Sequence, residues 1–206
     1  MRPLRIPAAV AALVACGLGL AACGPSRVAE TEPAQQTGQP AIGGPFQLTD
    51  QDGKPVDQRL LNGKWSAVFF GYTFCPNVCP TTLTTLGQAQ GQLGDRAKDL
   101  QVVFISVDPA RDTPGQLKSY LSSPVFPKGT VGLTGSADKV DQAAKAYKVF
   151  YQKEGSGADY VMDHTSLIYL MNPLGKFDRV LADSLKPDEI TRQIADAMSQ
   201  GPKAGA

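Results

Sequence analysis

Between about residue 45 and residue 200, hydrophobic and polar positions alternate with two different periods. Two apolar runs, 64–71 and 100–107, predict buried strands because β-branched and aromatic residues dominate them. A shorter strand is expected at 130–134. Helical patterns follow these strands, several of them opened by a proline or a capping residue. The helices are expected at 81–93, 114–121, 137–149 and 187–198.

Three pairs of shorter segments predict hairpins. They join 45–50 to 55–56, 150–153 to 160–162, and 166–171 to 176–181. Strands that alternate with helices, followed by a hairpin and a last helix, imply an α/β domain. We expect a mixed central sheet with helices on both faces, preceded by the N-terminal hairpin. A reactive cysteine loop after the first core strand makes this a thioredoxin-like fold.

The first 22 residues resemble an export signal of the lipoprotein type. Arg2 and Arg5 precede an apolar stretch that ends in Leu-Ala-Ala-Cys, which predicts lipid modification of Cys23. A retained membrane anchor and simple cleavage are the alternatives. The apolar stretch is shorter than the roughly 20 residues that span a bilayer. The expected location is a bacterial cell envelope, with the domain tethered to a membrane and facing the periplasm.

The predicted organisation after the signal is a flexible linker at 23–44, one domain at 45–200 and a disordered tail at 201–206. The linker is rich in Gly, Pro, Gln and Thr and has no hydrophobic periodicity. Loss of Arg2 and Arg5 with the signal leaves 18 basic and 19 acidic side chains, a net charge near −1. This balance does not favour nucleic-acid binding.

The chemistry centres on residues 71–80, GYTFCPNVCP, which join the first core strand to the first helix. Cys75 and Cys79 are there expected to lie near the positive end of a helix dipole, which favours thiolates. Thiolates bind soft metals and exchange disulfides. A structural disulfide is the alternative, but so short a loop would constrain the unfolded chain little. Three residues separate the sulfurs, one more than in thioredoxin-type redox motifs.

The chain contains a single histidine, His164, just before the strand expected at Ser166. A thioredoxin-like fold would bring its loop beside Cys75 and Cys79. Two thiolates and one imidazole form a soft ligand set of low coordination number. Such a set suits Cu(I), can bind Cu(II), and also accepts zinc. Structural zinc usually takes four protein ligands, so we expect copper, as Cu(I) or Cu(II).

Three ordered motifs together resemble the Sco/SenC family of copper-binding, thioredoxin-like proteins. They are GYTFCPNVCP at 71–80, SVDPARDTP at 106–114 and Asp-His-Thr at 163–165. The resemblance implies that Cys75, Cys79 and His164 bind copper and that the cysteines cycle between dithiol and disulfide. It also implies an assembly role, either delivering copper to the binuclear copper site of cytochrome c oxidase or reducing its cysteines.

The resemblance implies two partners, the copper-bearing oxidase subunit and an upstream copper donor. It also makes Asp108 a candidate for tuning the metal site, and the alternative is that Asp108 orders the following turn with Arg111. Asp163 is a candidate for orienting His164. The rival function is a thiol-disulfide oxidoreductase or a peroxiredoxin-like peroxidase that uses Cys75 and Cys79. Against it, the position before Ser166 lacks the cis-proline usual in thioredoxin-like oxidoreductases.

Overall fold

A computed structural model describes residues 41–202 of the chain. The predicted export signal, Cys23 and most of the predicted linker lie outside this range, as do the last four residues. Within 41–202, no helix combines the length and the apolar character that a membrane span requires.

Seven strands form one mixed sheet in the order β2-β1-β5-β4-β3-β8-β9. Parallel pairing joins β3 to β4 and β4 to β5, whereas the other neighbours are antiparallel. The strands are β1 (Gln47–Asp50), β2 (Pro55–Asp57), β3 (Trp65–Gly71), β4 (Leu100–Ser106), β5 (Val131–Thr134), β8 (Ile168–Met171) and β9 (Phe177–Leu181).

The centre of the sheet is buried on both faces, as expected where helices cover parallel strands. All seven residues of β3 are buried, and so are all four of β8. The register pairs Gly71, the last residue of β3, with Ser106, the last residue of β4. The ends of these two strands therefore bring the cysteine loop and the segment after Ser106 to the same edge of the sheet.

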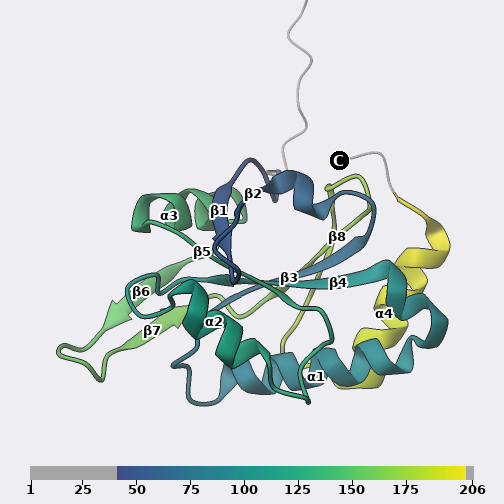
Figure 1. Ribbon diagram of the computed structural model, residues 1–206. Coiled ribbons are helices and arrows are strands. Elements are labelled where there is room, and N and C mark those ends of the chain that lie inside the picture. Colours follow the sequence, from purple (N-terminus) through teal and green to yellow (C-terminus); the bar gives the residue numbers. More distant parts are fainter. Residues whose placement is uncertain (1–40, 203–206) are drawn as a thin grey trace, which may run out of the picture. The chain divides into compact units, whose positions relative to one another are not determined.

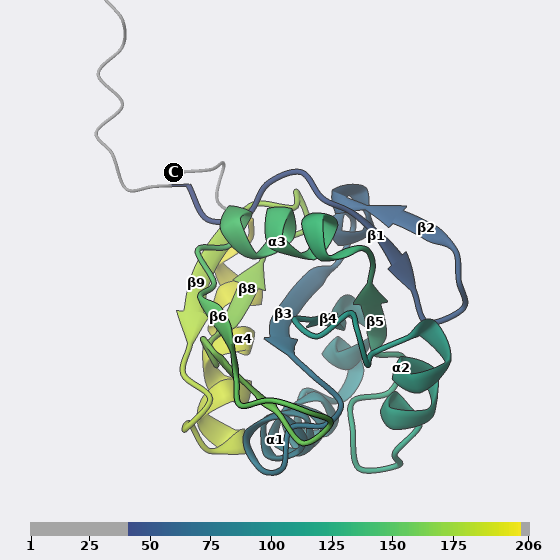
Figure 2. The same ribbon diagram turned by 90° about the vertical axis from the view of Figure 1, so that its left-hand side faces the viewer.

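Helices cover both faces of the sheet (Figures 1 and 2). Helices α1 and α4 pack against each other on one face, and α3 lies on the opposite face, over β1. The α-helices are α1 (Val78–Gln92), α2 (Pro114–Leu121), α3 (Ala137–Ala146) and α4 (Pro187–Gln200). Two 3-10 helices, η1 (Gln58–Leu61) and η2 (Gly94–Asp99), were not predicted.

The largest differences from the predicted helix boundaries are at the start of α1 and at the end of α3. Helix α1 begins at Val78 rather than at residue 81, so that Cys79 belongs to its first turn. Helix α3 ends at Ala146 rather than near Val149. There Lys148 adopts a left-handed conformation (φ 58°), and the Val149 N–H donates to the carbonyl of Ala144. This is the pattern of a Schellman cap, which stops a helix.

The predicted pairing of residues near 150–153 and 160–162 is confirmed as a separate two-stranded sheet. Its strands are β6 (Tyr151–Glu154) and β7 (Val161–His164). His164 is therefore the last residue of a strand, and not part of a loop as expected. Both views show this hairpin beside the beginning of α1 (Figures 1 and 2).

Candidate metal centre

The two cysteines lie where β3 passes into α1. Cys79 is fully buried in the first turn of the helix, whereas Cys75 is half-buried in the loop before it. The Cys79 N–H donates to Cys75 Sγ at 3.3 Å, and the Cys75 N–H donates to the carbonyl of Tyr72. The amide at the start of α1 therefore points at the Cys75 sulfur, as expected from the orphan donors and positive dipole end of a helix N-terminus.

Gly71 makes room for the buried sulfur. A Cβ atom at this position would lie 2.8 Å from Cys79 Sγ and 2.8 Å from the ring of Phe104. A residue with a side chain would therefore push the thiol or the core out of place. The requirement for glycine here was not recognised in the sequence, where Gly71 reads only as the end of a strand.

His164 reaches the sulfurs from the end of β7. Its Nε2 atom lies 3.6 Å from Cys79 Sγ, although 85 positions separate the two residues along the chain. Its Nδ1 atom lies 3.1 Å from the carbonyl oxygen of Thr165. A carbonyl only accepts hydrogen bonds, so Nδ1 carries a proton and Nε2 is the nitrogen available to a metal.

Aromatic rings hold the imidazole from two sides. The ring of Tyr72 meets that of His164 edge-on, with centroids 5.9 Å apart and an interplanar angle of 89°. Phe69 approaches it at 6.3 Å and 72°. Both residues come from the strand and loop that also carry the cysteines, so the same segment positions all three candidate ligands.

The structure thus brings the three sequence-predicted residues together. One ligand atom from each of Cys75, Cys79 and His164 lies within 4.8 Å of the other two. Soft sulfur and borderline nitrogen donors favour Cu(I), Cu(II) or zinc over hard cations. The cluster therefore has the composition and the compactness of a site for a soft metal ion.

The two thiols have opposite electrostatic environments. The Cys79 thiol donates to the Cys75 sulfur and, with the nearby amides and His164, lowers the pKa of Cys75 to about 4 despite partial burial. The same hydrogen bond, together with burial and the nearby Cys75 charge, raises the pKa of Cys79. The expectation of two thiolates is therefore right for Cys75 only, because the metal-free pair shares one proton.

Burial disfavours a charged His164, but hydrogen bonds to Cys75 and to the Thr165 carbonyl outweigh it. The net effect raises the pKa of His164 above its ordinary value. A bound metal would displace the Cys79 proton and any proton on His164 Nε2, because thiolate and neutral imidazole are the ligating forms. Metal uptake should therefore release protons.

Alkylation of the fully reduced protein should report the ionisation of Cys75. We expect labelling by iodoacetamide to remain fast at mildly acidic pH and to fall only as pH drops through about 4, because the thiolate is the reacting form. In Cys79→Ala the thiol donor is gone, so the midpoint should move upward. A wild-type midpoint at about 8.5, the value of an ordinary cysteine, would contradict this description.

Asp108 is not part of the cluster. Its carboxylate pairs with the Arg111 guanidinium and accepts a hydrogen bond of 2.7 Å from the Tyr160 hydroxyl. Its carbonyl accepts from the amides of Arg111 and Asp112. These contacts agree with the alternative for Asp108, the ordering of the following turn with Arg111. Tuning of the metal site by Asp108 stays a prediction. Asp163 is exposed, and the carbonyl of Thr165 rather than Asp163 contacts the imidazole Nδ1.

Asp112 is a buried acidic residue that the sequence did not single out. It is fully buried and accepts hydrogen bonds from the backbone and hydroxyl of Thr73, two residues before Cys75. Burial raises the pKa of Asp112, although hydrogen bonds from Ser106 and Thr73 oppose the shift. The only sign of its importance in the sequence was its position in the motif SVDPARDTP. The end of that motif already had an explanation, because Thr113 and Pro114 are the cap and first residue of a helix.

The fold and this cluster define a thioredoxin-like domain with two cysteines and a histidine poised for a soft metal. Comparison with known proteins agrees: the SCO1/SenC family model matches residues 34–199. The chain therefore belongs to the SCO1/SenC family.

Three relatives illustrate the similarity. The mitochondrial protein SCO2 of Saccharomyces cerevisiae is 41% identical over 152 residues, which cover 72% of this chain and 50% of that protein. The structure of Bradyrhizobium japonicum ScoI with copper bound is 43% identical, with a TM-score of 0.70 and coverage of 76% of this chain and 99% of that one. BsSco, described as having a disulfide switch and as a member of a family of cytochrome c oxidase assembly proteins, is 29% identical. Its TM-score is 0.61, with coverage of 75% of this chain and 92% of that chain. The chain spans about half the length of the first curated relatives that it matches.

Proposed function

We propose that this chain binds one copper ion through Cys75, Cys79 and His164 and acts in the assembly of cytochrome c oxidase. The observation that carries the proposal is the convergence of these three ligand atoms within 4.8 Å. The copper-bound structure of a relative 43% identical supports the choice of metal. Copper is the cargo in this proposal, received from an upstream donor and passed to the copper-bearing subunit of the oxidase.

The environment of the cluster suits uptake and release of a metal better than permanent storage. Cys75 is half-exposed and ionised above about pH 4, so an incoming ion meets a ready thiolate. Cys79 is buried behind it and must lose a proton before it ligates. Three ligands leave a coordination position that a donor or acceptor thiolate can enter during ligand exchange.

Copper titration of the reduced protein tests this proposal. Binding should saturate near one equivalent, and His164→Ala should weaken it on the order of a hundredfold, since loss of a ligand costs at least as much as loss of an outer-shell partner. Gln152→Ala, which changes an exposed residue of the same hairpin, serves as the control. Equal affinity in wild type and His164→Ala would contradict the assigned ligand set.

A second function draws on the same two sulfurs. Cys75 and Cys79 can reduce a disulfide of a partner protein: the Cys75 thiolate attacks one sulfur, and Cys79, deprotonated, then displaces the partner to form a Cys75–Cys79 disulfide. Two electrons pass to the partner, which leaves with two thiols. The disulfide switch identified in BsSco supports this second role. Reduction of an oxidised peptide carrying the oxidase copper-site cysteines, with no copper present, distinguishes this role from copper delivery.

The membrane tether is also proposed. It rests on the lipobox-like ending at Cys23 and on the apolar stretch before it. Mass spectrometry of the mature protein from bacterial membranes tests it, because a first residue other than a lipidated Cys23 would exclude lipoprotein processing.

A further inference from the structure

The hairpin that carries His164 needs an anchor outside itself. Its strands β6 and β7 pair only with each other and not with the seven-stranded sheet. An isolated two-stranded hairpin is at best marginally stable in water. Nevertheless, His164 lies within 3.6 Å of a fully buried sulfur on α1. The anchoring contacts therefore decide where the imidazole is placed.

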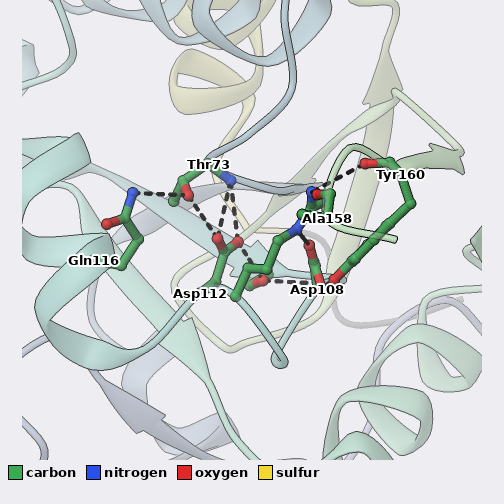
Figure 3. A network of polar contacts seen from close by, with 8 residues as sticks. Thr73, Asp108, Asp112, Gln116, Ala158 and Tyr160 are labelled. Atoms are coloured by element: carbon green, nitrogen blue, oxygen red, sulfur yellow. Dashed lines mark hydrogen bonds and ion pairs between the residues drawn. The ribbon is translucent and has the colours of Figure 1, made fainter. Parts of the chain in front are cut away.

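The first set of anchoring contacts comes from the turn after β4. Tyr160, just before β7, donates its hydroxyl to Asp108 at 2.7 Å. Arg111, paired with the same carboxylate, donates through Nη1 to the carbonyl oxygens of Ala158 (3.2 Å) and Tyr160 (3.0 Å). Its guanidinium carbon lies 3.5 Å from the centroid of the Tyr160 ring. Figure 3 shows these contacts reaching from the turn to the hairpin.

The second set of contacts reaches the cysteine loop from the same turn. Asp112 accepts hydrogen bonds from the Thr73 hydroxyl at 2.6 Å and from the Thr73 amide at 3.1 Å. Gln116 donates to the same hydroxyl at 3.2 Å. Thr73 stands two residues before Cys75, in the loop that leads from β3 into α1 (Figure 3). Asp112 is fully buried, so these bonds are shielded from water.

One buried hydroxyl connects the two sets of contacts. Ser106, the last residue of β4, donates to Asp112 at 2.6 Å and accepts from the Asp108 amide at 3.0 Å. The Arg111 guanidinium also lies 4.7 Å from the ring centroid of Phe74, in the cysteine loop. The turn 106–112 is thus bonded to both segments that carry candidate ligands, and is itself fastened to the central sheet.

We propose that the turn 106–112 is a clamp that sets the position of the His164 imidazole relative to the two sulfurs. Asp108, Arg111 and Tyr160 form its hairpin arm, and Asp112 with Thr73 forms its cysteine arm. They are positioning residues, since none of them touches the metal cluster directly. The proposal deepens the copper-binding function proposed above and rests on it only for its second test.

The first test uses the metal-free, reduced protein and therefore does not depend on copper binding. Tyr160→Phe removes only the hydroxyl that reaches Asp108. Amide exchange at Thr165, whose N–H donates to Phe150 across the base of the hairpin, should accelerate roughly fivefold, as expected for one lost hydrogen bond. Exchange in β3 should stay unchanged. Gln152→Ala, an exposed position of β6 outside the clamp, is the matched control and should leave the rate at Thr165 unaltered.

The second test separates the two arms in the copper-loaded protein. In Tyr160→Phe, paramagnetic resonance of the Cu(II) form should show a weakened nitrogen coupling, while the thiolate-to-copper absorption persists. In Thr73→Val, which keeps the shape but loses the hydroxyl, the thiolate absorption should shift while the nitrogen coupling persists. A global loss of stability would alter both signals in both variants.

Two results would overturn the clamp. The first is an amide exchange rate at Thr165 that is the same in Tyr160→Phe as in the wild type. The second is an identical change of the copper spectra in Tyr160→Phe and Thr73→Val. Failure of the wild-type protein to bind copper would instead reject the proposed function. The exchange experiment would then still decide whether the turn holds the hairpin.

Discussion

Cys79→Ser should abolish tight copper binding, with an affinity loss on the order of a thousandfold or more. Outer-shell substitutions around metals alone cost about 10–100-fold, and this variant removes a ligand. Serine offers a neutral hydroxyl, a poor donor for a soft ion, at a position that is completely buried. No other described thiol is close enough to replace it, because Cys75 is already part of the cluster.

Competition with a chelator of known Cu(I) affinity measures this effect. Thr82→Ser is the matched control, because it also alters a buried side chain of α1 but leaves both sulfurs in place. Thermal unfolding of the metal-free proteins should show that Cys79→Ser remains folded. Retention of wild-type affinity in the folded variant would rule out Cys79 as a ligand.

Gly71→Ala should destabilise the domain and damage the metal centre together. The new Cβ would stand 2.8 Å from both Cys79 Sγ and the Phe104 ring, two groups with no exposed surface. Overpacking of this kind typically costs about 1–3 kcal/mol. For a domain of this size that corresponds to a fall in Tm of roughly 2–12 °C. The displaced sulfur should also weaken copper binding beyond what the lower stability explains.

Gly91→Ala provides the matched control for this variant. Gly91 lies in α1, and a Cβ there would meet nothing within 4 Å. Alanine is the better helix former, so this variant should gain about 0.5–1 kcal/mol. Calorimetry and copper titration of both variants check the pair. Equal stability of Gly71→Ala and wild type would contradict this prediction. It would show that Cys79 and Phe104 can move aside for a methyl group at no measurable cost.

Much of the fold was predictable because local patterns and tertiary packing agree. The runs that became β3 and β4 are mostly apolar and rich in aromatic or β-branched residues, as is typical of strands that helices cover on both faces. Helix α2 begins where Thr113 and Pro114 predicted it, with the Thr113 hydroxyl accepting from the Gln116 amide. The boundaries were less predictable. The end of α3 depends on the left-handed conformation of Lys148, which is uncommon for lysine and could not be predicted from the residue type.

The candidate ligands were predictable for a different reason. Only Cys75 and Cys79 remained in the predicted domain, because Cys16 lies within the predicted signal and Cys23 is the predicted lipidation site. The chain also has a single histidine. The predicted thioredoxin-like fold then placed the segment of His164 beside the loop that carries Cys75 and Cys79. The opposite pKa shifts of Cys75 and Cys79 were not predictable, because they depend on which thiol is buried and which one donates.

The amino-acid sequence by itself determined the order of strands and helices, the soft character of the donor atoms and the family resemblance, since residue type and short-range spacing carry all of these. Only the tertiary structure decided that Asp108 binds both Arg111 and Tyr160, and that Asp112 reaches back to Thr73 across 39 positions. Hydrogen bonds between segments distant in the sequence produce no repeating residue pattern from which they could be predicted. They exist only once the sheet has brought the ends of β3 and β4 side by side.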